Sequence, residues 1–218
     1  MSKKELTKRY VLFIISLFFA ALGVAITKYV ELGVSPISSV ANIFSYKYTS
    51  LSLGTWLIIW NSTMVLGQIL ILRKNFQLIQ LLQIPLSILF GYFTDLGLRL
   101  ISFVPVEHYI VRLLLVLCGV VTLGFGISLA VIADVILNAG EAFVKAVADT
   151  IDRNFGNVKI GFDIFCVLFS VVLSLLFFNG QIVGTREGTV ISALLTGLVV
   201  KFFTRIMKKP LDEVLRNC

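Results

Sequence analysis

The chain has 218 residues, of which 58% are apolar and only 14% are charged, and its formal net charge is +7. Soluble domains are close to half apolar and one quarter charged, so this composition and the mean hydropathy of +0.97 exclude an ordinary soluble domain. They indicate a polytopic membrane protein whose expected partner is the lipid bilayer. Topology and anionic lipid account for the basic excess, so no nucleic-acid partner is expected.

Six apolar runs are long enough to cross a bilayer as helices. In chain order they are residues 10–30, 53–72, 78–98, 110–133, 160–178 and 188–206. The first run is too long for the apolar region of a signal peptide and has no small-residue cleavage site after it. We therefore expect it to be retained as the first span.

The basic residues predict the orientation. With a cytoplasmic N-terminus, 14 of the 19 Lys and Arg residues fall in inner segments, and the other five are Lys28, Lys47, Arg99, Arg112 and Arg186. Cytoplasmic loops of membrane proteins carry such an excess. The sequence therefore predicts a multi-pass protein of the cell (inner) membrane, with both termini and a short basic tail in the cytoplasm.

Two polar segments between spans predict short helices. In the first, Ser35 can act as the N-cap, and Pro36 suits the first helical position because it needs no N–H there. In the second, Asn138 or Gly140 can act as the N-cap, and Glu141 suits the first turn through the helix dipole. We expect these helices over residues 35–47 and 139–154. Both are too short to cross the membrane, and each is either re-entrant or flat at an interface.

The order span, short helix, span, span occurs twice and predicts two related halves, residues 1–106 and 107–218. Identities at spacings that drift between 101 and 107 residues, such as Gly23 with Gly124 and Gly54 with Gly161, give weak additional support. With three spans each, the halves would enter the membrane from opposite sides, as in the inverted repeats of secondary transporters. The expected fold class is an all-α membrane protein with about six transmembrane helices in two three-span halves.

Polar side chains inside apolar spans are costly in lipid, so we expect them to face the surface between the halves. The first N–H groups of the two short helices also suit a polar or anionic group. The candidate substrate-binding residues are Ser35, Pro36, Ser38, Asn61, Gln68, Gln80, Asn138, Gly140 and Glu141. For Asn61, Gln68 and Gln80, the alternative is hydrogen bonding between packed helices.

Three further acidic residues have assigned roles. Glu31 and Asp134 each follow the first span of a half, where the helix dipole disfavours a carboxylate. They are candidate proton-coupling groups, or alternatively residues at the membrane–water interface. Asp163 begins the fifth span and is expected to make a structural ion pair with Lys145 or Lys159.

The sequence contains no catalytic or metal-binding constellation. His108 is the only histidine, and the three cysteines, Cys118, Cys166 and Cys218, fit buried thiols better than a disulfide framework or a metal site. An enzymatic activity and a cofactor are therefore not expected.

Several stretches together resemble the YczE/YyaS/YitT family of bacterial integral membrane proteins. They are LGVSPIS at 32–38, LSLGTW at 51–56, AGEAFVKAV at 139–147 and GTREGTVISALLTGLVVKFF at 184–203. The resemblance implies a bacterial multi-span membrane protein and supplies no substrate. We expect a secondary transporter of a small polar or anionic solute. The alternatives are the substrate-binding membrane subunit of a multi-component importer and a non-transporting scaffold or regulator.

Labelling of single cysteines with a membrane-impermeant reagent tests this topology. In a background without the native cysteines, a cysteine at Lys74 or Lys208 should react only from the cytoplasm, and a cysteine at Arg186 only from outside. Reaction of position 74 from the outside would contradict both the orientation and the opposed entry of the two halves.

Overall fold

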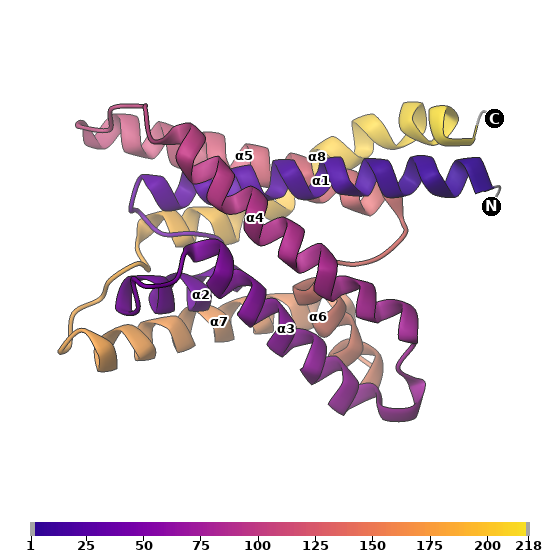
Figure 1. Cartoon of the computed structure of the whole chain (residues 1–218), viewed down its shortest axis with the longest axis horizontal. Coiled ribbons are helices and arrows are strands. Elements are labelled where there is room, and N and C mark those ends of the chain that lie inside the picture. Colours follow the sequence, from indigo (N-terminus) through magenta and orange to yellow (C-terminus); the bar gives the residue numbers. More distant parts are fainter. Residues whose placement is uncertain (1–2, 217–218) are drawn as a thin grey trace.

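The computed structural model describes residues 3–216, and every regular element in this range is a helix (Figure 1). The α-helices are α1 (Lys3–Tyr29), α2 (Pro36–Lys47), α3 (Leu53–Leu72), α4 (Gln83–Ile101), α5 (Tyr109–Ala133), α6 (Ala139–Thr150), α7 (Phe155–Phe177) and α8 (Glu187–Arg216). Two 3-10 helices, η1 (Arg73–Asn75) and η2 (Leu78–Leu82), join α3 to α4. Every α-helix except α2 and α6 is long and apolar enough to span a membrane, which confirms the prediction of a polytopic membrane protein.

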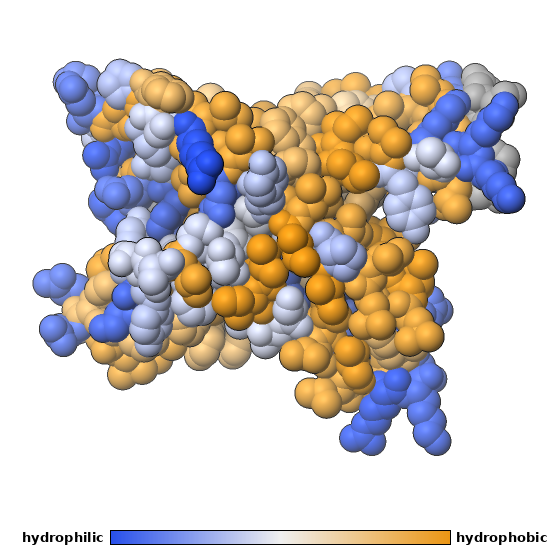
Figure 2. All heavy atoms as spheres, viewed as in Figure 1, coloured by the Kyte–Doolittle hydropathy of each residue, from blue (hydrophilic) through white to orange (hydrophobic). Residues whose placement is uncertain are grey.

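The distribution of side chains fits a layer of lipid around the middle of the molecule. Figure 2 shows hydrophilic residues gathered towards both horizontal ends of the view, with apolar side chains over the region between them. Exposed apolar residues recur at helical spacing on α8, namely Val190, Leu194, Leu198, Phe202 and Ile206. Such a face is expected where a helix contacts lipid.

Several element ends differ from the predictions. Helix α1 begins at Lys3, before residue 10, and α7 begins at Phe155, before residue 160. The predicted span 78–98 begins with the 3-10 helix η2 and continues as α4 to Ile101, and α6 ends at Thr150, before residue 154. The predicted tail continues α8 to Arg216, with Pro210 inside the helix. Residues of this tail contact the start of α1, so the tail is part of the folded structure. Of the three cysteines, Cys118 is exposed and Cys166 is buried, and Cys218 lies outside the described residues.

Arg9 joins the two ends of the chain to the end of α5. Its side chain is 4% exposed and donates from Nη1 to the carbonyl oxygens of Ile132 and Ala133, at 3.2 and 3.1 Å. These carbonyls belong to the last turn of α5, where they have no partner within the helix. Arg9 also pairs with Glu5 at 3.0 Å and with Asp212 at 3.6 Å.

Helices α1 and α5 cross at small residues at the centre of the molecule. A methyl group on Gly23 would overlap the backbone of Leu123, and one on Gly126 would overlap the backbone of Ala20. Small residues allow such close approach, which is how helices associate within a bilayer. The crossing forms the spine on which α4 and α8 pack, α4 against α1 and α8 against α5.

Both short helices begin inside the molecule. After α1 the chain turns back through Glu31 (φ 57°) and Gly33 (φ 110°), and after α5 it turns back through Asp134 (φ 48°). These left-handed conformations end a helix and reverse the chain. The first turns of α2 and α6 then meet, because a methyl group on Gly140 would lie 3.0 Å from Cδ1 of Ile37. Their tips are therefore internal, and neither helix lies flat on the surface.

The two long helices that follow each short helix are arranged differently. Helix α3 packs against α4, but α7 and α8 are not packed against each other (Figure 1). Instead α7 lies against α2 and α6. This separation leaves space beside the tips of the short helices.

Replacing Gly126 by leucine tests the close crossing of α1 and α5. The side chain would overlap the backbone of α1, and overpacking of this kind costs about 1–3 kcal/mol or more. We expect a lower apparent melting temperature in detergent. Gly161→Leu on α7 is the matched control, since a Cβ there meets no atom within 4 Å, and it should melt close to the wild type. Equal melting of the two variants would contradict the crossing.

Candidate functional site

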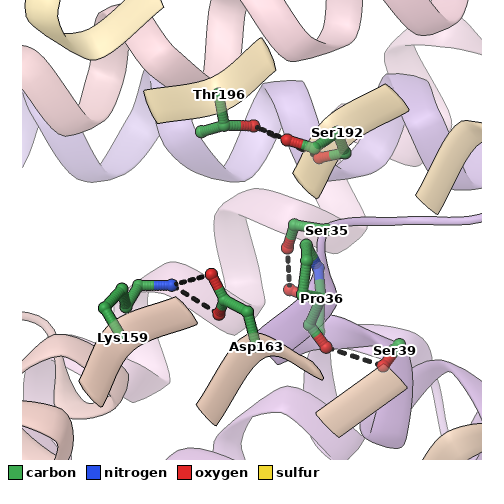
Figure 3. A network of polar contacts seen from close by, with 8 residues as sticks. Ser35, Pro36, Ser39, Lys159, Asp163, Ser192 and Thr196 are labelled. Carbon is green, nitrogen blue, oxygen red and sulfur yellow. Dashed lines mark hydrogen bonds and ion pairs between the residues drawn. The ribbon is translucent and has the colours of Figure 1, made fainter. Parts of the chain in front are cut away.

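A cavity of about 370 Å³ lies at the centre of the protein, where the tips of α2 and α6 meet. All eight α-helices contribute to its lining. It fills the space between α7 and α8, as the view in Figure 3 shows, with Lys159 and Asp163 on one side and Ser192 and Thr196 on the other. A cavity of this size lies at the small end of the range for small-molecule sites.

The N-terminal ends of α2 and α6 face the cavity without side-chain caps. Ser35 and Asn138 hold the N-cap positions with nearly identical backbone angles, φ −57° and ψ 150° against φ −58° and ψ 151°. Neither side chain bonds to the N–H groups of its helix. By contrast, the N-caps of α3 and α7, Ser52 and Asn154, do bond to their helices. The N-caps of α4 and α5, Leu82 and His108, make no such bond either. Among these uncapped helices, α2 and α6 are the two whose N-cap residues line the cavity.

An ion pair from α7 forms one wall beside these tips. Lys159 Nζ lies 2.6 Å from Oδ2 of Asp163 and also contacts Oδ1, with both side chains about one quarter exposed. Next to Asp163, the Ser35 hydroxyl donates to the Ser38 hydroxyl at 2.9 Å (Figure 3). The predicted pairing of Asp163 with Lys159 is confirmed, while Lys145 pairs with Asp149 at 3.2 Å.

Glu141 brings a second carboxylate to the cavity. It stands in the first turn of α6 and is half-buried. Burial raises the pKa of its carboxyl group, the Lys159 ammonium opposes that rise, and the Asp163 carboxylate adds to it. The three charged residues of the lining thus influence one another.

Three uncharged polar side chains of the lining have no partner among residues 3–216. Ser87 on α4 is 5% exposed, and Asn61 on α3 and Asn138 before α6 are half-buried; none of the three side chains makes a hydrogen bond within the described chain. A buried hydroxyl or amide without a partner is costly. These groups are therefore available to a polar ligand in the cavity.

The remaining wall is apolar. Phe13 and Leu17 of α1, Phe90 of α4, and Leu123 and Ile127 of α5 line it. No charged residue of α1, α4 or α5 lines the cavity. The site therefore has one polar wall, made by the helix tips and α7, and one apolar wall.

Seven of the nine predicted binding residues line this cavity: Ser35, Pro36, Ser38, Asn61, Asn138, Gly140 and Glu141. The other two do not. Gln68 and Gln83 exchange two hydrogen bonds of 2.9 and 3.1 Å, and Gln68 also donates to the carbonyl of Ala139. These hydrogen bonds, the Gln68–Gln83 clasp, join α3, α4 and α6. Gln68 therefore follows the alternative given above, hydrogen bonding between packed helices. Gln80 lies in η2, outside the lining.

The two predicted proton-coupling acids lie apart from the cavity. Glu31 and Asp134 are exposed, and each takes a left-handed conformation where α1 or α5 ends. Their matched positions are thus explained by the reversal of the chain.

Lys159, Ser192 and Thr196 belong to the lining but were not predicted as site residues. The available signal for Lys159 was its spacing of four residues from Asp163 near the start of an apolar span. Ser192 and Thr196 share that spacing on α8, and the Thr196 hydroxyl donates to the Ser192 carbonyl at 2.6 Å. This pattern is common in helices and does not by itself indicate a site.

Comparison with known proteins gives a family and no activity. No curated protein and no solved structure matches the chain. The model of a family of unknown function, DUF6198, matches residues 7–205, and the resemblance to the YczE/YyaS/YitT family stays a prediction. Because the match spans nearly the whole sequence, the chain belongs to the DUF6198 family of unknown function.

Proposed function

We propose that this protein is a secondary transporter that moves a small solute through the central cavity by alternating access. The observation that carries the proposal is the cavity itself. Two uncapped helix tips meet in it, and of the helices that line it α3 and α4 are packed against each other whereas α7 and α8 are not. Sites formed by interrupted helices near the bilayer midplane are typical of secondary transporters.

Reciprocal contacts support two halves that are related by a two-fold axis. Gly23 approaches the backbone of Leu123 and Gly119, and Gly126 approaches the backbone of Ala20 and Ser16. Adding 103 to the residue number takes Gly23 to Gly126, Ala20 to Leu123 and Ser16 to Gly119. One contact therefore repeats the other with the halves exchanged.

The same relation extends beyond α1 and α5. The N-caps Ser35 and Asn138 are 103 positions apart, as are the left-handed residues Glu31 and Asp134. The Gln68–Gln83 clasp corresponds at a spacing of 102 to a hydrogen bond of 2.9 Å between Ser170 and Thr185. The spacing we propose is thus 102–103 residues, within the range of 101–107 suggested by sequence identities.

One contact of the first half has no counterpart in the second half. We propose that this difference marks a gate. In the first half, Gly54 of α3 meets the backbone of Gly91 of α4. Asp95 fastens this contact by accepting hydrogen bonds from the Gly54 N–H at 2.9 Å and from the Ser52 hydroxyl at 2.5 Å. In the second half the counterpart of Asp95 is Gly197, where an added Cβ would meet nothing within 4 Å. We assign the fastened contact to a closed outer gate and the open one to the inner gate.

The position of the opening supports this assignment. The lining includes Phe155, the first residue of α7, and Gln83, the first residue of α4. Both lie at the end of the molecule that carries Arg9 and Asp212, the predicted cytoplasmic end. At the opposite end, Lys28 donates to Asn42 at 2.6 Å, and Asn42 donates to the Gly184 carbonyl at 2.8 Å, which ties the ends of the two halves together. The structure would then represent an inward-open state, and transport would require α3 to leave α4 while α7 approaches α8.

Uptake by the purified protein tests the function. Liposomes containing only this protein should retain one class of solute from a mixed pool above the level of protein-free liposomes, as measured by mass spectrometry. Binding without uptake would instead favour the importer subunit, because such a subunit needs its partner proteins to translocate. Neither binding nor uptake would favour the scaffold or regulator.

The Gly91→Leu variant tests the gate. A Cβ at this position would lie 2.5 Å from the Gly54 carbonyl oxygen and 2.7 Å from Cγ1 of Ile58, so leucine should wedge α3 away from α4. In a background without native cysteines, an Asn61→Cys reporter should then react with an impermeant maleimide added outside. Without the wedge, or with Gly197→Leu as the matched change in α8, outside labelling should stay low. Equally low labelling with Gly91→Leu would contradict the gate.

A further inference from the structure

The charges around the cavity add up to almost zero, although they are strong and separated. The charged side chains of the lining are Lys159, Asp163 and Glu141, with a formal sum of −1. The two uncapped helix tips each contribute about +0.5 of an elementary charge. A ligand with net charge would therefore enter a site with no net charge to balance it, and an unbalanced buried charge is expensive.

The two signs of charge lie at different places in the site. Helix α2 has no acidic residue in its first turn, so its tip stays positive, whereas the first turn of α6 carries Glu141. Lys159 and Asp163 largely satisfy each other. The free positive group is thus the α2 tip beside Ser35, and the free negative group is Glu141.

The other residues of the lining fit a small molecule that carries both polar and apolar groups. Ser87 offers a buried hydroxyl and Asn61 a half-buried amide, neither with a partner among the described residues, which independently points to a polar ligand. The same lining offers an apolar surface at Phe90 and Ile127, which are both half-buried. A volume of about 370 Å³ restricts the ligand to a small molecule.

We propose that the cavity binds a zwitterionic solute with an apolar side group, which is the chemistry of an apolar α-amino acid. Its carboxylate lies at the N–H groups of α2, its ammonium group at Glu141, and its apolar group against Phe90 and Ile127. This assignment rests on the proposed function, because it names the substrate class of the same site. Multiply charged anions such as phosphates are disfavoured, since they would face two carboxylates with only one lysine nearby.

Binding by matched probes tests the substrate class separately from transport. The probes are valine, leucine, methionine and phenylalanine, each compared with the amine that lacks its carboxylate and the acid that lacks its amino group. Affinity is measured on the purified full chain in detergent by isothermal titration calorimetry. We expect at least one amino acid to bind, with its amine-only and acid-only analogues at least tenfold weaker, because each lacks one of the two charge contacts. Equal binding of either analogue, or no binding by all four amino acids, overturns the proposal.

Two variants locate the charge contact. Glu141→Gln should weaken binding of the amino acid at least tenfold while leaving the acid-only analogue unaffected, because only the ammonium contact is lost. Asp149→Asn is the matched control on α6, since Asp149 is exposed and pairs with Lys145, and it should bind like the wild type. Melting without ligand establishes that both variants are folded. Equal affinity of Glu141→Gln and the wild type for the amino acid would remove Glu141 from the site.

The outcomes separate the two proposals. Binding of the zwitterion without uptake in liposomes supports the substrate class and contradicts the transporter. Uptake of a different class of solute supports the transporter and overturns the substrate class.

Discussion

Two helices that start inside the protein impose the main constraint on this structure. The first N–H groups of any helix lack partners within the helix, and in an apolar interior they need another source of hydrogen bonds. For α2 and α6 the N-cap side chains do not supply these bonds. The other helices enclose a space around the tips, and polar residues of several spans line it beside a larger apolar surface.

Helix α7 connects this space to the proposed movement. It carries Lys159 and Asp163, and it packs on α2 and α6 rather than on α8. In the movement we propose, α7 approaches α8, which would bring Lys159 and Asp163 closer to Ser192 and Thr196. A solute bound at the tips would then contact both walls at once. Ligand binding and closure would be coupled through the same surface, which is the differential interaction that a population shift requires.

The sequence predicted features that depend on local chemistry. Span positions follow from length and apolarity, and Pro36 and Glu141 indicated where the short helices begin. The role of Gln68 was not predictable, because its partner Gln83 depends on how α3 and α4 rotate against each other. The positions of Glu31 and Asp134 were recognised, but their left-handed backbone, which ends a helix, leaves no signal in the side chain. The sequence alone did not single out the spacing of 102–103 residues that we propose between the halves, because apolar helices share many identities by chance.

The partners of α1 also have a consequence for biosynthesis. Its close contacts at Gly23 and Arg9 are with α5, more than 90 residues later in the chain, and with the end of α8. When α1 to α4 have been inserted, Gly23 and Arg9 of α1 still lack their partners in α5 and α8. The early spans must therefore remain in the membrane, or bound to an insertion factor, without these contacts until α5 is made. A chain cut between α4 and α5 would present two fragments with complementary faces, each incomplete until it meets the other.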